Sequence, residues 1–199
     1  MKDALIIFQK NAELGKVKTR LAATIGDQAA FDAYQLLVNY THKITSQSPV
    51  QKIVFFSNHL EEDLSKYPAD YRFELQSGEG LGEKMSCAFE QLFKENYDRL
   101  IIIGTDCAEI TAELISVAFD KLKESEVVIG PAHDGGYYLL GMRKFIPGLF
   151  EGIPWSTDQV AELSMDYLTS NNYSYATLPV LSDVDLQKDW ERFESKLTK

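Results

Sequence analysis

Short apolar runs without interspersed polar residues constrain the fold of this chain more than any other feature. Examples are ALIIF at residues 4–8 and LIII at residues 100–103. A strand with one solvated face alternates apolar and polar residues, so unbroken runs are typical of parallel strands covered by helices on both faces. The strand candidates are residues 4–8, 52–57, 72–75, 100–104, 126–130, 137–142 and 173–178.

Helical periodicity fills the stretches between these runs. Apolar or small residues recur at steps of three and four from Phe31 to Ile44, and similar spacing recurs at 85–93 and 114–122. Residues 186–197 are expected to form a closing helix. Alternating strands and helices favour an open, mostly parallel α/β sheet with right-handed crossovers. In such sheets ligands bind beyond the carboxyl ends of the strands. A length of 199 residues fits a single domain over residues 1–199.

Composition excludes several classes of protein. A formal net charge of −10 argues against a nucleic-acid binder, although it leaves a small phosphorylated ligand open because distant charges are screened. No apolar run approaches the roughly 18 residues that span a membrane, and the apolar stretch within the first ten residues is too short for the apolar region of a signal peptide. Cys87 and Cys107 lack metal-type spacing. We therefore expect a reduced, cytoplasmic protein without a membrane span, and its oligomeric state is left open.

A basic loop follows the first predicted strand. It places four of the chain's 20 basic residues within residues 10–20, namely Lys10, Lys16, Lys18 and Arg20. Gly15 permits a backbone turn, and a loop that leads into a helix can present N–H groups and cations to a phosphate. The alternative is a solvated basic turn. The loop is not a Walker A motif, because Lys10 stands in place of the first glycine and Val17 follows Lys16.

A second glycine-rich segment, residues 76–85, is one residue too short for a dinucleotide fingerprint. A strand-to-helix turn there would still let the backbone approach a base or ribose, and it makes Gln76, Gly80 and Gly82 candidates for nucleotide binding.

Aspartates at the ends of predicted elements are candidate metal ligands. Asp106 comes just after the apolar run at 100–104, and Mg²⁺ prefers one or two carboxylates with phosphates and water. Asp106 could instead begin a turn. Asp183 and Asp185 precede the last predicted helix, where either could cap the helix or supply a second carboxylate. The neighbouring Cys107 is interpreted as a small buried residue rather than a nucleophile.

The segment GPAHDGGYYLLG at residues 130–141 joins two predicted strands. Its Asp-Gly pair could be an ordinary hairpin turn. Asp134 could also face an acceptor or a sugar, since a histidine and two tyrosines accompany it. Further on, residues 153–158 are read as a helix start capped by Ser156 or Thr157, with Trp155 either packing or lining a pocket. His42 and His59 are given no role.

Taken together, six segments resemble a bacterial family of uncharacterised, glycosyltransferase-like proteins (DUF2064). That family is related to the nucleotidyltransferase acting on 2-phospholactate, and some members are described as arsenosugar-biosynthesis glycosyltransferases. The matching segments are FQKNAELGKVKTRLA, QSGEGLGEKM, IIIGTDCAEI, GPAHDGGYYLLG, IPWST and LSDVDLQKDW.

The resemblance implies the GT-A fold, a Rossmann-like sheet of the nucleotide-diphospho-sugar transferases that holds phosphates through a divalent cation, Mg²⁺ or Mn²⁺. By similarity, Gly15, Lys16, Lys18 and Arg20 fall in the phosphate loop. Asp106 and Asp185 fall at the metal positions. The family usually carries prolines where this chain has residues 11–13, and a proline where Ala108 stands, so we expect less rigid loops here.

These observations favour a metal-dependent transferase with a small-molecule nucleotide or nucleotide-sugar donor and an unidentified acceptor. Lys18 and Arg20 would stabilise developing negative charge. Nucleotidyl transfer to a phosphorylated acceptor needs a second basic cluster, which the sequence does not show. Glycosyl transfer needs a general base, for which Asp134 is available. The alternatives are a nucleotidyltransferase, a non-catalytic nucleotide-binding module and a dehydrogenase, and the glycine spacing speaks against the last.

Overall fold

A computed structural model describes residues 1–198 of the chain. Strands and helices alternate along it as the apolar pattern predicts. In chain order the elements are β1 (Asp3–Gln9), α1 (Thr19–Ile25), α2 (Asp27–Thr45), β2 (Gln51–Phe56), β3 (Arg72–Leu75), α3 (Gly80–Lys94), β4 (Arg99–Ile103), α4 (Ala112–Lys121), β5 (Val127–Pro131), β6 (Tyr137–Met142), the 3-10 helix η1 (Pro147–Phe150), α5 (Val160–Ser170), β7 (Tyr175–Thr177) and α6 (Gln187–Leu197).

The strands form one mostly parallel sheet of seven strands in the order β3-β2-β1-β4-β6-β5-β7. This confirms the predicted α/β class. β6 runs antiparallel to both of its neighbours, whereas the other pairings are parallel. The reversal arises because β5 and β6 are joined by a tight turn, in which the N–H of Ala132 donates to the carbonyl of Gly136 (2.9 Å). A connection this short permits only an antiparallel pair.

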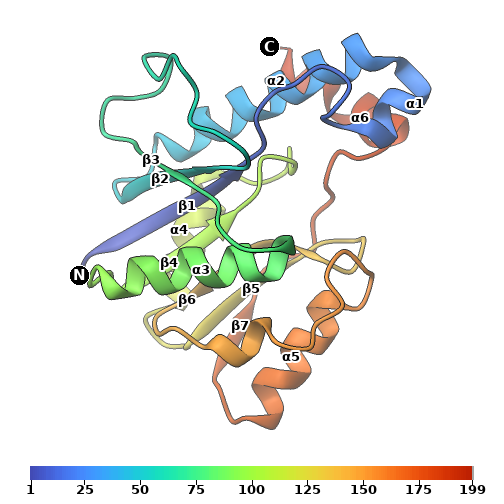
Figure 1. Cartoon of the computed structure of the whole chain (residues 1–199). Helices are drawn as coiled ribbons and strands as arrows, with labels where there is room; N and C mark the ends of the chain where they lie inside the picture. Colours follow the sequence, from blue (N-terminus) through green and yellow to red (C-terminus); the bar gives the residue numbers. More distant parts are fainter. Residues whose placement is uncertain (199) are drawn as a thin grey trace.

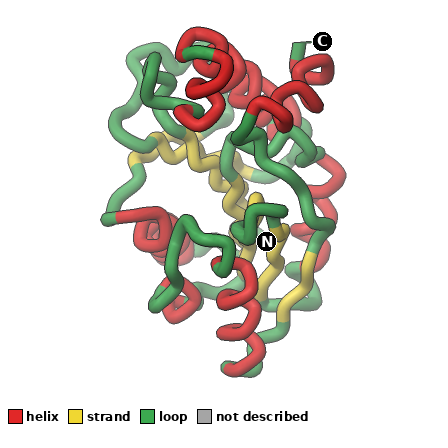
Figure 2. Tube along the Cα trace, turned by 90° about the vertical axis from the view of Figure 1, so that its right-hand side faces the viewer, coloured by secondary structure: helices red, strands yellow, loops and turns green. Residues whose placement is uncertain are grey.

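Helices cover both faces of the sheet, which explains why the strands lack polar alternation. Side chains of α3, η1 and α5 pack with Ala4 and Ile6 on one face. Side chains of α4 and the end of α2 pack with Leu5 and Ile7 on the other face. Figure 1 shows α1, α2 and α6 gathered at one end of the molecule and α5 at the other. The tube in Figure 2 shows the strands lying between these groups of helices.

The predicted cap of α5 is wrong, and of the two alternatives for Asp183 and Asp185 the helix cap does not occur. α5 begins only at Val160, and neither Ser156 nor Thr157 caps it. At α6, the carboxylate of Asp189 accepts hydrogen bonds from the N–H groups of Leu186 (2.9 Å) and Asp185 (3.3 Å). Asp189 therefore caps this helix from inside its first turn, which leaves the side chains of Asp183 and Asp185 available for other contacts.

No helix within residues 1–198 combines the length and the apolar character that a membrane span requires.

Candidate active site

A cleft of about 710 Å³ opens at the carboxyl ends of β1 and β4, where open α/β sheets bind their ligands. The loop after β1, the start of α3, the β5–β6 turn and the segment before α6 all contribute to it. Of the predicted site residues, the cleft is lined by Lys10, Lys16, Lys18, Arg20, Gln76, Gly80, Asp106, Asp134 and Asp185. Gly15 and Gly82 are not among its lining residues.

Lys18 joins the two predicted metal ligands. Its ammonium nitrogen lies 2.6 Å from Oδ1 of Asp106 and 3.3 Å from Oδ1 of Asp185. The Lys18 side chain is only 5% exposed, whereas those of the two aspartates are 42% and 40% exposed. Arg20 lies at the edge, 3.7 Å from Oδ2 of Asp185, and its side chain is 75% exposed. The two carboxylates therefore already hold a cation between them.

Backbone contacts bring Asp185 to Asp106, although 78 residues separate them in the sequence. The N–H of Val184 donates to the carbonyl of Asp106 (2.9 Å), and the thiol of Cys107 contacts the carbonyl of Ser182 (3.5 Å). Cys107 is buried, as predicted, and burial raises the pKa of its thiol to about 12. Because its thiolate form is disfavoured, this residue is a packing residue and not a nucleophile.

The backbone of Lys18 is held in the left-handed region, with φ 48° and ψ 43°, at the start of α1. A residue with a Cβ in this region costs on the order of 1–3 kcal/mol, so the surrounding structure must enforce it. The result is a side chain directed into the cleft. The solvated-turn alternative therefore does not describe Lys18, whereas the side chains of Lys16 and Arg20 are 72% and 75% exposed.

The loop after β1 is anchored without the prolines that the family usually carries there. The amide of Asn11 donates to the carbonyl of His59 (2.9 Å), and its Oδ1 accepts from the N–H of Asn58 (3.0 Å). Tyr34 of α2 donates to the carbonyl of Lys10 (2.7 Å). These hydrogen bonds hold the first residues of the loop in place, and lower rigidity of the loop relative to the proline-bearing family members stays a prediction.

Burial and neighbouring charges shift the pKa values of ionisable side chains in the cleft. Burial alone would lower the pKa of Lys18, but the carboxylates of Asp106 and Asp185 outweigh it and raise that pKa, which keeps the ammonium charged. Burial raises the pKa of Asp183 to about 7, and the neighbouring charge of Asp106 adds to the increase. The two aspartates of this segment thus differ: Asp185 pairs with Lys18, while Asp183 lies in a desolvated position.

The donor set fits a hard divalent cation. Within residues 1–198 no three histidine, cysteine, aspartate or glutamate side chains form a ready-made metal site. Mg²⁺ however is commonly held by one or two carboxylates together with substrate phosphates and water. Asp106 and Asp185 supply two such carboxylates, and the ammonium of Lys18 stands between them where a cation is stabilised.

The second glycine-rich segment begins α3 at the mouth of the cleft. Gly80 has a positive φ of 71° and lines the cleft, while the amide of Gln76 donates to the carbonyl of Phe55 (3.0 Å). A Cβ on Gly82 would lie 2.0 Å from Nε1 of Trp155. Gly82 is therefore required for the packing of Trp155 against α3, and Trp155 both packs and lines the cleft.

Asp134 sits at the tip of the β5–β6 turn. Its Oδ1 accepts a hydrogen bond from the N–H of Gly136 (3.0 Å), as a turn-forming aspartate does. The turn is also held from outside, because the N–H of Ala161 donates to the carbonyl of Gly135 (2.8 Å). The hairpin interpretation is thus confirmed, and the same turn places Asp134 in the lining of the cleft.

Comparison with known proteins identifies the family. The model of the family described as "Uncharacterized protein conserved in bacteria (DUF2064)" matches residues 40–157, more than half of the chain. The chain belongs to this family. The crystal structure of a "putative nucleotide-diphospho-sugar transferase" from Desulfovibrio desulfuricans G20 is 31% identical, with a TM-score of 0.86, covering 94% of this chain and 84% of that chain. No curated protein matches.

Other solved structures share the fold at lower identity. CMP:2-keto-3-deoxy-manno-octonic acid synthetase, complexed with CTP, is 10% identical with a TM-score of 0.63, covering 100% of this chain and 99% of the other. A cytidylyltransferase from Leptospira borgpetersenii is 13% identical with a TM-score of 0.62, covering 100% and 87%. The fold is therefore that of nucleotide-diphospho-sugar transferases, and the comparisons support a nucleotide-using transferase at this coarse level.

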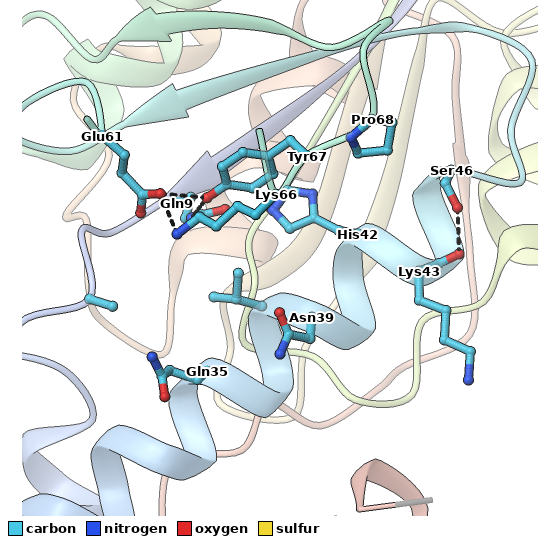
Figure 3. Close-up of a pocket in the computed structure, with 12 residues that line it drawn as sticks. Gln9, Gln35, Asn39, His42, Lys43, Ser46, Glu61, Lys66, Tyr67 and Pro68 are labelled. Carbon is cyan, nitrogen blue, oxygen red and sulfur yellow. Dashed lines mark hydrogen bonds and ion pairs between the residues drawn. The ribbon is translucent and has the colours of Figure 1, made fainter. Parts of the chain in front are cut away.

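Two features of this DUF2064 member were missed in the sequence. Lys84 of α3 lines the cleft together with the basic loop, although no local motif marks it. His42, which was given no role, lines a second cavity of about 490 Å³ between α2 and the loop after β2 (Figure 3). His42 was missed because α2 turns it inward, which its periodicity alone does not reveal.

A chain of hydrogen bonds runs along that second cavity (Figure 3). His42 Nε2 lies 2.7 Å from Oε1 of Gln9, and the Gln9 amide donates to the hydroxyl of Tyr67 (2.8 Å). Tyr67 donates in turn to Glu61 (3.0 Å), which pairs with Lys66 (2.6 Å). Burial lowers the pKa of His42 to about 4, and the charge of Lys66 adds to the decrease.

Proposed function

We propose that the protein is a metal-dependent transferase that uses a nucleotide-activated donor, and that it transfers a glycosyl group from a nucleotide-diphospho-sugar. The observation that carries the proposal is the pair of carboxylates, Asp106 and Asp185, that hold the cationic Lys18 at the carboxyl ends of the parallel strands. A basic loop and the start of a helix border the same cleft. The Desulfovibrio relative carries the corresponding name, which supports the proposal.

The donor phosphates would lie against the loop after β1. Lys10, Lys18 and Arg20 line the cleft there, and each could donate to a phosphate oxygen. Hydrogen bonds to charged groups contribute about 1.5–3 kcal/mol each, which is sufficient for a small anion to bind an acidic protein. A divalent cation held by Asp106 and Asp185 would supply further positive charge to the donor phosphates.

The acceptor would approach from the side of the β5–β6 turn. One oxygen of Asp134 is engaged by the N–H of Gly136. The second oxygen would then be the one that takes a proton from an acceptor hydroxyl. The turn is fixed by its hydrogen bonds to α5 and within the hairpin, so Asp134 would be held in place for this role.

Nucleotidyl transfer to a phosphorylated acceptor is the second candidate, and Lys84 favours it. The sequence shows no second basic cluster, but Lys84 of α3 lines the same cleft and could bind an acceptor phosphate. A single lysine is less than the basic cluster that this reaction requires, so glycosyl transfer remains the first candidate.

A thermal-shift panel tests the proposal. Nucleoside triphosphates, diphosphates and nucleotide sugars are each measured with Mg²⁺, with Mn²⁺ and with a chelator. A ligand at a hundredfold excess over its Kd stabilises the protein by about 2.7 kcal/mol. For a chain of this size that corresponds to a rise in Tm of about 5–10 °C.

The same panel separates the two candidates. Glycosyl transfer predicts the largest rise with a nucleotide sugar, whereas nucleotidyl transfer predicts the largest rise with a triphosphate. Asp106→Asn is the control, because it keeps the shape of the side chain and should abolish the metal-dependent part of the rise. Unchanged Tm with every nucleotide and both metals would refute a nucleotide-using transferase.

A further inference from the structure

We infer that the cleft takes up its divalent cation as a complex with the nucleotide and not as the free ion, because Lys18 holds the metal-binding carboxylates of the ligand-free protein. This inference rests on the proposed function and names the form of its substrate. It follows from the partners, the burial and the backbone of one residue.

Lys18 satisfies the carboxylates in the absence of ligand. Its ammonium contacts Asp106 at 2.6 Å and Asp185 at 3.3 Å, and these are the polar partners of a side chain that is only 5% exposed. The left-handed backbone at this position directs the side chain inward at a cost in conformational energy. Strain of this kind at a cleft is typical of residues that are positioned for function.

This arrangement disfavours binding of the free metal ion. A cation that binds both carboxylates must displace the ammonium or approach it closely. Displacement would leave a charged side chain buried without its partners, which is strongly unfavourable. Close approach would place two positive charges within a few ångströms in a partly desolvated cleft. Either way, the affinity for the free ion is lowered by Lys18.

A nucleotide removes this obstacle. Its phosphates would offer Lys18 new anionic partners inside the cleft, so the ammonium could leave Asp106 and Asp185 without losing its compensation. The cation that accompanies the phosphates would then neutralise the freed carboxylates. Metal and nucleotide should therefore each raise the affinity of the protein for the other, and by the same factor.

The wild-type protein gives the first test. Binding of Mn²⁺ alone is followed by the loss of the free-ion signal in electron paramagnetic resonance. Binding of ATP, CTP, GTP, UTP and UDP is measured by calorimetry in the presence of a chelator and of Mn²⁺. We expect weak binding of Mn²⁺ alone and, for at least one nucleotide, an affinity at least about tenfold higher with Mn²⁺ than with the chelator.

Lys18→Met gives the second test, since it removes the charge and keeps much of the side-chain volume. We expect Mn²⁺ alone to bind this variant at least about tenfold more tightly than it binds the wild type. Lys52→Met is the matched control. Lys52 is also 5% exposed and pairs with Asp70 at 2.7 Å, but it lies away from the cleft. Its loss should leave Mn²⁺ binding unchanged.

The outcomes separate this inference from the proposed function. Equally tight binding of free Mn²⁺ by wild type and Lys18→Met would overturn the inference, as would a nucleotide affinity that is independent of metal, and both leave nucleotide binding intact. A failure of every nucleotide to bind under any condition would overturn the proposed function together with the inference. If Lys18→Met does not fold, the wild-type comparison alone decides between weak and tight binding of the free ion.

Discussion

Acidification should destabilise this protein through His42, and the size of the effect can be estimated from its surroundings. The imidazole bonds Gln9 through Nε2 and packs edge-on against Tyr67, with ring centroids 4.8 Å apart. Its Nδ1 is buried without a hydrogen-bond partner among the described residues. Neither Tyr67 nor the more distant Tyr71 offers a negative charge, and Lys66 repels a cation. The folded state therefore favours the neutral form of the His42 imidazole.

The lowered pKa of His42 determines the direction in which stability changes with pH. In the unfolded chain His42 takes up a proton near pH 6.5, whereas in the folded protein its pKa is about 4. Its contribution to stability is complete above pH 6.5 and is lost as the pH falls from 6.5 towards 4. Because a tenfold change in proton affinity is about 1.4 kcal/mol, the full loss is about 3 kcal/mol at most. Between pH 7.5 and 5.5 about 1 kcal/mol should be lost.

The measurement compares wild type with His42→Gln, whose amide can still donate to Gln9 but does not titrate. Free energies of unfolding are determined by urea denaturation at pH 7.5, 6.5 and 5.5. The wild type should lose about 1 kcal/mol relative to the variant over this range. The comparison cancels the other titrating groups, Asp183 among them. His59→Gln, at an exposed position, should follow the wild-type pH dependence. Parallel curves for wild type and His42→Gln would refute the assignment.

Three further predictions concern the cleft. Arg20→Ala should weaken nucleotide binding about tenfold by calorimetry. It should leave Tm unchanged, since the Arg20 side chain is 75% exposed. Equal affinity of variant and wild type would show that Arg20 is only a solvated turn residue. Gly82→Ala should cost about 1–3 kcal/mol in urea denaturation, because its Cβ would meet Trp155 at 2.0 Å; undiminished stability would show that Trp155 moves freely. Asp134→Asn should keep nucleotide affinity while turnover falls by about 10²–10⁴-fold in steady-state kinetics; full turnover would leave it as a turn residue alone.

The strands could be predicted from the sequence because burial on both faces leaves a strong local signal. β3 and β6 have the predicted bounds, and β1, β2, β4 and β5 differ from the prediction by one residue at each end. The last strand is shorter than predicted, Tyr175–Thr177 instead of 173–178. It lies at an edge of the sheet, where exposed residues interrupt the apolar pattern.

The interior of the cleft could not be predicted in the same way, because its decisive contacts join residues far apart in the chain. Lys18 and Asp185 are 167 positions apart, and Asp106, the other partner of Lys18, is also distant from it in the chain. Lys18 looks like its exposed neighbour Lys16 in the sequence. The burial of Lys18 is accompanied by a left-handed backbone conformation, which the sequence does not predict at a residue other than glycine. Asp183 and Asp185 are likewise distinguished only by which of them reaches Lys18.

The final crossing of the chain connects the two regions of the cleft that the proposed function assigns to the donor and to the acceptor. After β7 the backbone runs along the carboxyl ends of the strands, where Leu181 donates to the carbonyl of Pro131 (3.2 Å) and Val184 to that of Asp106 (2.9 Å). The first contact fixes it to the β5–β6 turn, which carries Asp134. The second fixes it to the end of β4. Because one segment is tied to both places, the position of Asp134 relative to the carboxylate pair is set by backbone hydrogen bonds. Under the proposed function, side chains in the cleft would exchange partners on ligand binding while these backbone hydrogen bonds keep the spacing of the two regions.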